Sequence, residues 1–249
     1  QCAAHRFLRM NLPCLYRVHA PPAPEKMEEF AGFAEHLGFR FSAEGGVTPK
    51  KLAQFLEQIR DDPRKDMIHQ ILLRSLMKAV YQPDNVGHFG LAFPHYTHFT
   101  SPIRRYPDLL IHRAIKSALA GRRYDTLDWE AVGLACSATE RRADDATRDV
   151  DAWLKCWYMQ DRVGEIFTGS ISSVVPFGIF VALDTVFVEG LVHVSDLGRD
   201  YFHFDEKAHA MVGERTGVRY RLSDRVRVQL VRVDLDQNKI DFRLAEGAQ

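Results

Sequence analysis

The feature that most constrains the fold of this chain is a change in hydrophobic periodicity at about Gly164. Before this glycine, apolar residues recur every three or four positions, which is typical of helices with one buried face. After it, apolar and polar residues alternate in short runs, which predicts strands. The runs are IFTGSISSVV, GIFVAL, VFVEGLVHV, RVRVQLVRVD and KIDFRL. Five short strands with one longer excursion, from about Ser195 to Ser223, predict a small Greek-key barrel, the OB-fold.

The region before Gly164 is expected to be mainly helical. Helical spacing predicts helices over residues 24–37, 48–59, 66–80, 107–121 and 127–161. Pro24 and Pro49 suit the first helical turn, and glycine follows two of these helices. The segment 87–101 is aromatic and rich in His, and it is expected to be extended. The fold class is therefore α+β, with a mainly helical domain over residues 1–162 and a five-stranded barrel domain over residues 163–246.

The charge of the whole chain is balanced, with 33 Lys and Arg residues against 33 Asp and Glu residues. Contact with a polyanion must therefore come from local basic patches rather than from net charge. No apolar run approaches the ~20 residues that span a bilayer. We therefore expect no membrane segment, and we further expect a monomeric, cytoplasmic protein. The four cysteines are far apart and form no CxxC pair, which favours reduced thiols.

Aromatic residues of the predicted barrel indicate a surface on which bases stack. Phe177 and Phe180 straddle Gly178 at a turn, so they are poorly placed to be buried together. His193 lies at the end of the next predicted strand. Bases stack on such side chains with little preference for sequence.

Other side chains of the predicted barrel are given different roles. Arg227 and Lys239 are candidates for contacts with RNA phosphates, because cationic side chains neutralise the backbone of a nucleic acid. Phe167 and Phe187 are predicted to belong to the core.

The segment YTHFTSPIRRYPDLLIHR combines an arginine-rich turn, framed by prolines, with the start of a helix. Backbone N–H groups at a helix N-terminus bind phosphates, and guanidinium groups bind them bidentately. Arg104 and Arg105 are therefore candidate phosphate ligands, and Ser101 adds a hydroxyl donor. The alternative is an ordinary solvated surface, because most charge runs have no other role.

The barrel region resembles the S1 RNA-binding domain in the segments GSISSVVPFGIFVAL, VEGLVHVSDL and VRVQLVRVDLDQNKIDFRL. This resemblance covers the whole barrel region and implies binding of single-stranded RNA. The RNA face of the family falls on the aromatic residues named above, including His193. Its charged positions near the last hairpin fall on Lys239 and on Asp234 or Asp236.

The segments LYRVHAPPAPEKMEEFAGFAEHLG, GHFGLAFPHYTHFTSPIRRYPDLLIHRAI and ERRADDATRDVDAWLKC resemble the exoribonuclease family of ribonuclease II and ribonuclease R, and the ribonuclease R type in particular. The resemblance implies the C-terminal portion of an RNB-type catalytic domain, followed by the S1 domain. It places Arg104 and Arg105 beside the scissile phosphate. The residues that would line or brace the same place are Tyr96, His98, Ser101 and Tyr106.

The resemblance also implies an activity. The family degrades single-stranded RNA processively from the 3′ end, by hydrolysis to nucleoside 5′-monophosphates, with Mg²⁺ ions. Its metal-binding aspartates are expected upstream of this chain, so no metal site is predicted within the chain, which alone is expected to be inactive. The Asp-dense stretch from Asp144 to Asp151 is interleaved with arginines, which favours ion pairs along a helix over a metal site.

Two alternatives stay open on the sequence. One is a non-catalytic protein that binds single-stranded RNA and keeps the two arginines for affinity. The other is an OB-fold translation factor, which would leave residues 1–163 without a role. The sequence names no protein partner.

Overall fold

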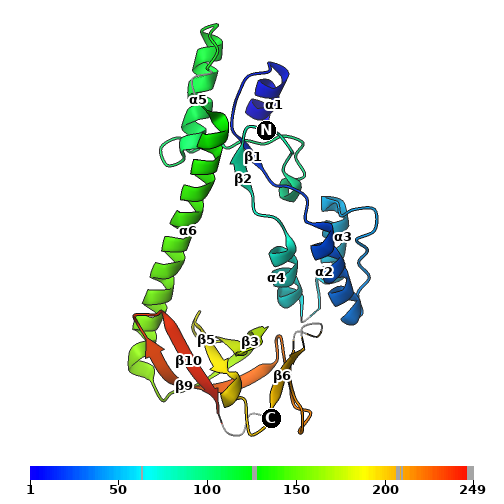
Figure 1. Cartoon of the computed structure of the whole chain (residues 1–249), viewed down its shortest axis with the longest axis vertical. Coiled ribbons are helices and arrows are strands. Elements are labelled where there is room, and N and C mark those ends of the chain that lie inside the picture. The colour runs from blue at the N-terminus through cyan, green and yellow to red at the C-terminus, as the bar shows by residue number, and fades with distance from the viewer. Residues whose placement is uncertain (63, 125–127, 206–207, 209, 246–249) are drawn as a thin grey trace. The chain divides into compact units, whose positions relative to one another are not determined.

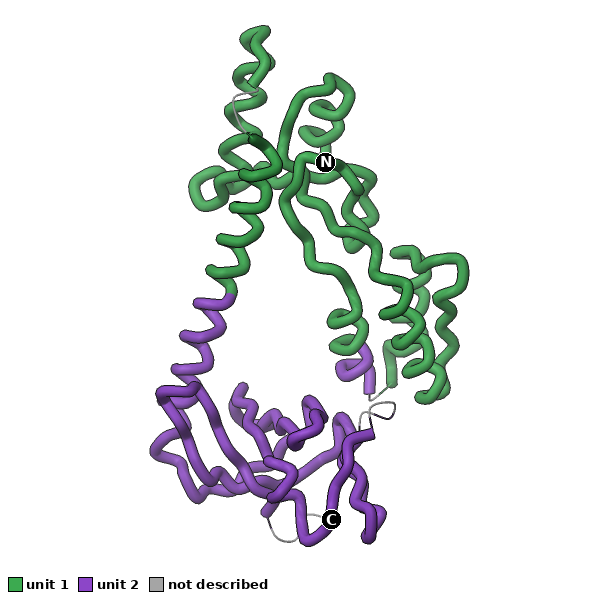
Figure 2. Tube along the Cα trace, in the orientation of Figure 1, with its two compact units in different colours: residues 1–62, 69–144 green, residues 63–68, 145–249 purple. Residues whose placement is uncertain are grey.

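The structure is a computed structural model that describes residues 1–62, 64–124, 128–205, 208 and 210–245. The chain divides into two compact units, which Figure 2 colours separately. Unit 1 comprises residues 1–62 and 69–144, and unit 2 comprises residues 63–68 and the chain from 145 onward. Each unit is described by itself below.

Unit 1 is mainly helical, and its described strands form one short two-stranded sheet (Figure 1). Its helices, two of which continue into unit 2, are α1 (Cys2–Arg9), α2 (Pro24–His36), α3 (Pro49–Gln58), α4 (Lys65–Ser75), α5 (Tyr106–Leu119) and α6 (Trp129–Met159), with a short 3₁₀ helix, η1 (Phe89–Leu91). The strands β1 (Tyr16–Val18) and β2 (Val80–Gln82) are antiparallel. Local signals explain several helix starts, as at α3, where Thr48 Oγ1 accepts from Lys51 N at 3.2 Å.

The helix predicted over residues 66–80 is shorter in the structure, and its predicted end is wrong. The helix α4 stops at Ser75, and Val80 belongs to β2, where it is paired with Val18. Tertiary pairing with a strand some 60 residues away therefore overrides the local helical pattern. The predicted start of the last helix, Leu127, lies outside the described residues, and α6 is described from Trp129.

The two-stranded sheet of unit 1 packs against a helix that precedes it and helices that follow it in the chain. One cluster of buried residues joins β1 to α1 and α5, and another joins Leu15 and Tyr81 to Leu110 and Trp129. The helices α2 and α3 meet through edge-to-face rings, with Phe30 and Phe55 centroids 5.3 Å apart. The two clusters of buried residues fix the sheet from which part of the candidate site is built.

Unit 2 contains the closed five-stranded barrel that the alternation predicts. The strand order is β10-β5-β4-β3-β9, with β10 closing on β9 and pairing in parallel with β5. The strands are β3 (Ile166–Val175), β4 (Gly178–Leu183), β5 (Glu189–His193), β9 (Arg225–Asp234) and β10 (Lys239–Leu244). Inward-facing residues such as Ile179, Val192 and Phe242 form the core, as the period of two requires.

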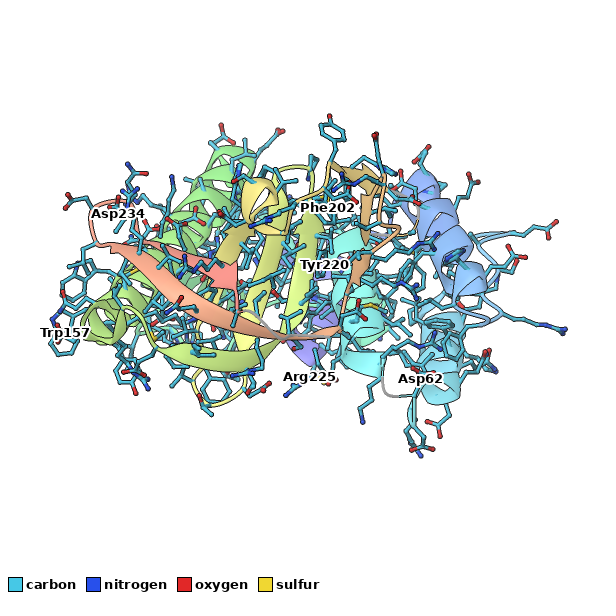
Figure 3. All side chains as sticks on the ribbon, turned by 90° about the horizontal axis from the view of Figure 1, so that it is seen from below. Asp62, Trp157, Phe202, Tyr220, Arg225 and Asp234 are labelled. Atoms are coloured by element: carbon cyan, nitrogen blue, oxygen red, sulfur yellow. The ribbon has the colours of Figure 1, made fainter. Side chains whose placement is uncertain are left out.

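The excursion between the third and fourth barrel strands has structure of its own. It holds a three-stranded antiparallel sheet of β6 (Phe202–Asp205), β7 (Ala210–Gly213) and β8 (Arg219–Arg221). Phe202 and Tyr220, labelled in Figure 3, lie with ring centroids 5.7 Å apart, and Tyr220 packs against the barrel core. The excursion is therefore a small sheet that extends the barrel core.

The prediction that Phe187 belongs to the core is wrong, whereas Phe167 is buried as predicted. Phe187 lies in the loop between β4 and β5 and is 100% exposed. Its neighbour Val188 is only 4% exposed. The backbone N–H of Val188 donates to Val186 O at 2.8 Å, so the chain bends tightly at Phe187 and leaves this side chain in solvent while Val188 is buried.

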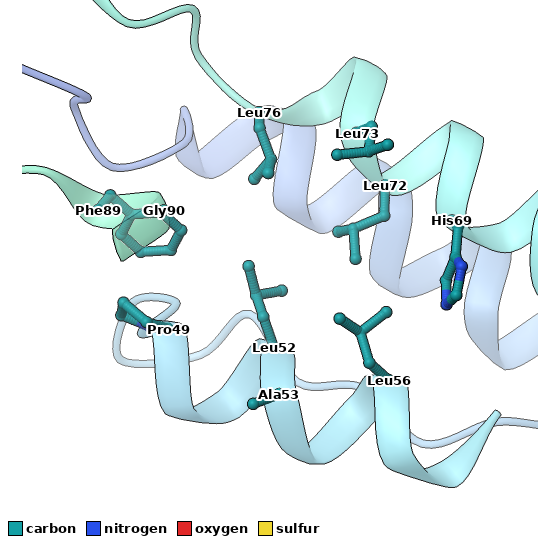
Figure 4. Close-up of a pocket in the computed structure, with 10 residues that line it drawn as sticks. All are labelled: Pro49, Leu52, Ala53, Leu56, His69, Leu72, Leu73, Leu76, Phe89 and Gly90. Carbon is teal, nitrogen blue, oxygen red and sulfur yellow. The ribbon is translucent and has the colours of Figure 1, made fainter. Parts of the chain in front are cut away.

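The structure also has an apolar groove of about 410 Å³ in unit 1, shown in Figure 4. It is lined by Pro49, Leu52, Ala53, Leu56, His69, Leu72, Leu73, Leu76, Phe89 and Gly90. His69 is the one titratable side chain among these residues, so the groove offers no pair of groups for acid–base chemistry. Across the described chain, no helix combines the length and apolar character that a membrane span requires.

Candidate functional site

The arginine-rich turn lies directly before α5, whose first turn contains Pro107 and Asp108. Arg105 precedes the helix, and its backbone N–H donates to Ser101 O at 3.0 Å. The Asp108 side chain is fully buried, and its Oδ2 accepts from Ser101 N at 2.7 Å and from Arg105 Nη2 at 2.8 Å. This carboxylate therefore connects the turn, the helix start and one of the two arginine side chains.

The two neighbouring arginines have different surroundings. The Arg105 side chain is 22% exposed and paired with Asp108. Arg104 is exposed, and the described part of the chain provides no ion pair for its guanidinium group. Tyr106, the next residue, is 46% exposed, and Ser101 is half-buried. The turn thus offers one free cation and one cation that is already held in place, which together suit an anionic ligand.

Tyr96 and His98 belong to a row of aromatic rings in the extended segment before the turn. The rings of His88 and Tyr96 meet edge to face with centroids 5.3 Å apart, and those of Tyr96 and His98 with centroids 5.7 Å apart. Both Tyr96 and His98 are half-buried. Each ring therefore has an exposed part that a ligand could contact and a part that is held by neighbouring rings.

His98 is joined to Tyr81 of β2, since its Nδ1 lies 2.8 Å from Tyr81 Oη. Burial, followed by the charges of Arg105 and Arg17, lowers the pKa of His98 to about 4. Burial raises the pKa of Tyr81 to about 12. At neutral pH both groups are uncharged, so His98 can offer hydrogen bonding or stacking, but no positive charge.

Tyr81 is itself held by side chains from two other elements. The guanidinium group of Arg17, on β1, lies 4.5 Å from the centroid of the Tyr81 ring. Arg17 Nη1 is also paired with Glu140 Oε2 of α6 at 2.7 Å. None of these three residues is found by sequence reasoning, because they come together across separations of up to 123 residues. The available signal is a cation inside the apolar run LYRV, since a cation in a buried strand needs a partner.

The three aromatic candidates of the barrel lie on one side of β4 and β5. Phe180 faces outward from β4 because its neighbours Ile179 and Val181 are buried. Phe177, in the preceding turn, is 50% exposed, and the two Phe rings meet edge to face with centroids 6.3 Å apart. His193 is exposed at the end of β5, opposite Gly178 in the register. The structure therefore brings exposed Phe177, half-buried Phe180 and exposed His193 together on one aromatic face.

The two basic candidates of the barrel are less close to this face. Arg227, which is exposed, is opposite Thr168 on β3, whereas Phe180 is opposite Ser173, so the two pairs occupy different levels of that strand. Lys239 begins β10, and its Nζ donates to Gln237 Oε1 at 2.7 Å. Both side chains are thus exposed on the outside of the barrel.

The acidic candidates lie in the hairpin between β9 and β10. Asp234 Oδ1 accepts the backbone N–H groups of Gln237 and Asp236 at 2.9 and 3.1 Å. The bond from Gln237 is the main reason that the pKa of Asp234 is lowered. Asp234 therefore stabilises the hairpin, and Asp236 is the more exposed of the two carboxylates.

No group of three or more His, Cys, Asp or Glu side chains that could hold a metal ion occurs among the described residues. In the Asp-dense stretch of α6, Asp145 is paired with Arg148, as the interleaved charges predict. Histidines near the arginine turn make hydrogen bonds instead: His112 Nε2, for example, lies 2.9 Å from Phe99 O.

Comparison with known proteins identifies both parts of the chain. The RNB domain matches residues 1–121, and the S1 RNA binding domain matches residues 160–244. Ribonuclease R of Vibrio cholerae is 48% identical over 249 residues, which cover 94% of this chain and 30% of that protein. Residues 1–121 thus belong to the RNB domain family, and residues 160–244 to the S1 domain family. Ribonuclease R of Escherichia coli agrees with this placement. It is 46% identical over 256 residues, and the alignment covers 97% of this chain and 32% of that relative.

Solved structures of the RNB family give the same result for the fold. The apo form of Mycoplasma genitalium RNase R matches with a TM-score of 0.90 and 28% identity, over 98% of this chain and 39% of that chain. The same protein in complex with ribose methylated single-stranded RNA matches equally, with a TM-score of 0.90. The resemblance to the ribonuclease R type and the S1 domain is therefore confirmed. The chain spans about a third of the length of the curated relatives it matches.

Proposed function

We propose that the protein that contains this chain is a processive 3′→5′ exoribonuclease, which hydrolyses single-stranded RNA to nucleoside 5′-monophosphates. The observation that carries the proposal is the presence, in one chain of the RNB family, of an arginine turn with a free cation and a barrel with an exposed aromatic face. Relatives named ribonuclease R support the activity. The RNA complex of one relative supports the ligand.

In this proposal the barrel captures single strands by stacking. Phe177, Phe180 and His193 supply three flat side chains on one side of β4 and β5, of which Phe177 and His193 are exposed and Phe180 is half-buried. Each stacked base is worth ~1–3 kcal/mol and needs no particular sequence. Arg227 and Lys239 add phosphate contacts along the outside of the barrel, which makes the affinity depend on salt.

The arginine turn holds the phosphodiester at the end of the strand. Arg104, exposed and without an ion pair among the described residues, neutralises phosphate charge, and Arg105 offers a guanidinium group fixed by Asp108. The residues proposed to line or brace the same place are Ser101 and Tyr106 in the turn and Tyr96 and His98 in the segment before it. His98 contributes as a neutral side chain, because its pKa is lowered to about 4.

The described residues do not fit a metal centre, since they contain no suitable group of ligands. The divalent metal of the family, proposed to be Mg²⁺, would be held by aspartates outside the described residues and would activate the attacking water. The cytoplasmic location and the monomeric state stay predictions.

The experiment for the nuclease function uses the full-length protein and a 3′-labelled single strand. We expect release of labelled mononucleotide in Mg²⁺, and a loss of ~10²-fold or more when Arg104 and Arg105 are both replaced by Ala, as when a group that stabilises transition-state charge is removed. Arg74→Ala, at an exposed arginine in the last turn of α4, is the matched control and should retain activity. Full activity of the double variant would contradict the phosphate role.

The experiment for RNA capture uses the isolated chain and measures the Kd for a single strand. Phe177→Ala and Phe180→Ala should each weaken binding ~5- to 150-fold, which corresponds to ~1–3 kcal/mol. Phe187→Ala is the control, because Phe187 is an exposed Phe of the same unit in a different loop. Equal effects of all three substitutions would contradict a defined aromatic face.

The alternative is a non-catalytic protein that binds single-stranded RNA. The observation that favours it for the chain alone is that the described residues lack a group of metal ligands. Binding without cleavage by the isolated chain, together with cleavage by the full-length protein, supports the proposed nuclease. Binding without cleavage by both would support the alternative.

A further inference from the structure

The arginine turn adjoins a buried carboxylate, that of Asp108. The side chain is 0% exposed, although it carries a carboxylate in the first turn of α5. A buried carboxylate is costly unless charged or polar groups compensate for the water it has lost. Here Oδ2 has two donors, Ser101 N at 2.7 Å and Arg105 Nη2 at 2.8 Å.

The compensation is incomplete in a specific way. Asp108 Oδ1 and Arg105 Nε are both shielded from solvent, and neither has a hydrogen-bond partner within the described structure. Removal of the Asp108 charge would therefore leave Arg105 with a buried N–H group and no anion beside it. The cost of that arrangement is large because an unpaired buried charge loses hydration without replacement. Arg105 would then turn toward solvent, where its side chain is already 22% exposed.

We propose that Asp108 is the positioning residue of the phosphate site, which acts by fixing Arg105 and the Ser101 end of the turn and does not touch RNA. This inference rests on the proposed nuclease function. It divides the work between the two arginines. Arg104 supplies a cation that no ion pair among the described residues neutralises, and Arg105 supplies a guanidinium group whose orientation is set before RNA arrives. A prearranged group binds the transition state without the entropy cost of ordering a flexible side chain.

The different roles of the two arginines predict that loss of the Asp108 charge lowers turnover without weakening RNA binding. Asp108→Asn keeps the shape of the side chain and an oxygen that can accept from Ser101 N, but it removes the negative charge. The turn then carries more net positive charge, so ground-state RNA binding should stay equal or become tighter. Turnover should fall about 10- to 100-fold, because a small displacement of a catalytic group has an effect of that size. A merely destabilised fold would weaken both.

The test compares full-length variants by single-turnover cleavage and by Kd for the same single strand. We expect Asp108→Asn to lower turnover 10- to 100-fold with no weaker binding, and Asp66→Asn to change neither. Asp66 is the matched control because it is an exposed aspartate in the first turn of α4. In an Arg105→Gln background, Asp108→Asn should cause no further loss, since the residue it positions is gone. Unchanged turnover of Asp108→Asn, or full additivity with Arg105→Gln, would overturn the inference.

A spectroscopic measurement separates this inference from the proposed nuclease function. In the isolated chain, the Nε–H of Arg105 is shielded from solvent, so its NMR signal should exchange slowly with water. In Asp108→Asn the Arg105 side chain should become mobile, so its Nε–H should exchange with water at least 10-fold faster. The chemical shifts of the α5 backbone away from position 108 should stay unchanged. Slow exchange in both proteins would overturn the positioning role even if the enzyme cleaves RNA. A full-length protein that binds RNA without cleaving it would refute the nuclease function, with the NMR result still deciding the role of Asp108.

Discussion

The close approach of α6 to β2 predicts opposite effects for one substitution at two glycines. Gly133 lies within α6, and a Cβ there would be 2.7 Å from Tyr81 O and 3.2 Å from Tyr81 C. Gly32 lies within α2, is exposed, and a Cβ there would have no atom within 4 Å. In an open helical position, Gly→Ala removes the extra backbone freedom of glycine and stabilises by ~1 kcal/mol. We therefore expect Gly32→Ala to be stabilising.

At Gly133 the same gain is outweighed by two costs. An ordinary contact begins at 3.4 Å, so the added carbon and Tyr81 O must separate by 0.7 Å, the difference between 3.4 and 2.7 Å. Overpacking of this kind costs ~1–3 kcal/mol. Ser137 Oγ accepts from Tyr81 N at 2.9 Å, and displacing the strand strains this buried bond at ~1–3 kcal/mol. After the helical gain of ~1 kcal/mol, the net destabilisation is about 1–5 kcal/mol.

The assay is urea denaturation followed by the fluorescence of Trp129, which is buried in the core of unit 1 and 7% exposed. The chain has three tryptophans, so Trp153→Phe and Trp157→Phe leave Trp129 as the single indole reporter. Gly32→Ala should raise the free energy of unfolding of unit 1, and Gly133→Ala should lower it. A Gly133→Ala variant that is as stable as the parent protein would refute the reasoning, because α6 and β2 could then not be in direct contact at this glycine.

Three further predictions follow from ionisable groups. His98 should titrate near pH 4 when followed by NMR. Because its pKa in the folded chain lies below the ordinary 6.5, its contribution to stability is complete above about pH 6.5 and is lost as the pH falls toward 4. Asp200 should titrate near pH 2, chiefly because the Thr216 hydroxyl donates to it, so its contribution is present above about pH 4 and is lost as the pH falls toward 2. Thr216→Val should move that pKa toward 3.8, and no movement would contradict the assignment. Burial raises the pKa of Cys14 to about 12, so iodoacetamide at about pH 8 should modify exposed Cys2 in the native chain and Cys14 only after unfolding, as mass spectrometry can show.

The barrel could be predicted from sequence because its strands carry their burial pattern locally. In β4, inward Ile179 and Val181 alternate with outward Phe180, and the same alternation fixes which aromatic side chains are exposed. The error at Phe187 arises where the alternation leaves the strand and enters a loop. The error at Val80 has a different cause. Its pairing with Val18 is a long-range contact, which no local window of the sequence contains.

The candidate site shows the same division between local and long-range information. Arg105 and Asp108 are three residues apart at a helix start, so the sequence could indicate the turn and its charge. Tyr81, Arg17 and Glu140 come from separate elements, so the sequence could not indicate that Tyr81 contacts His98 and is held by Arg17, the ion-pair partner of Glu140. The ion pair of the turn is therefore local, whereas the pKa of His98 is lowered by burial and by the charges of Arg105 and Arg17, and Arg17 belongs to β1, which pairs with β2. It follows that substitutions in β1 and β2 should alter the surroundings of His98 beside the arginine turn, although residues of these strands need not contact RNA. Distance from the turn in sequence is therefore a poor guide to the effect of a substitution.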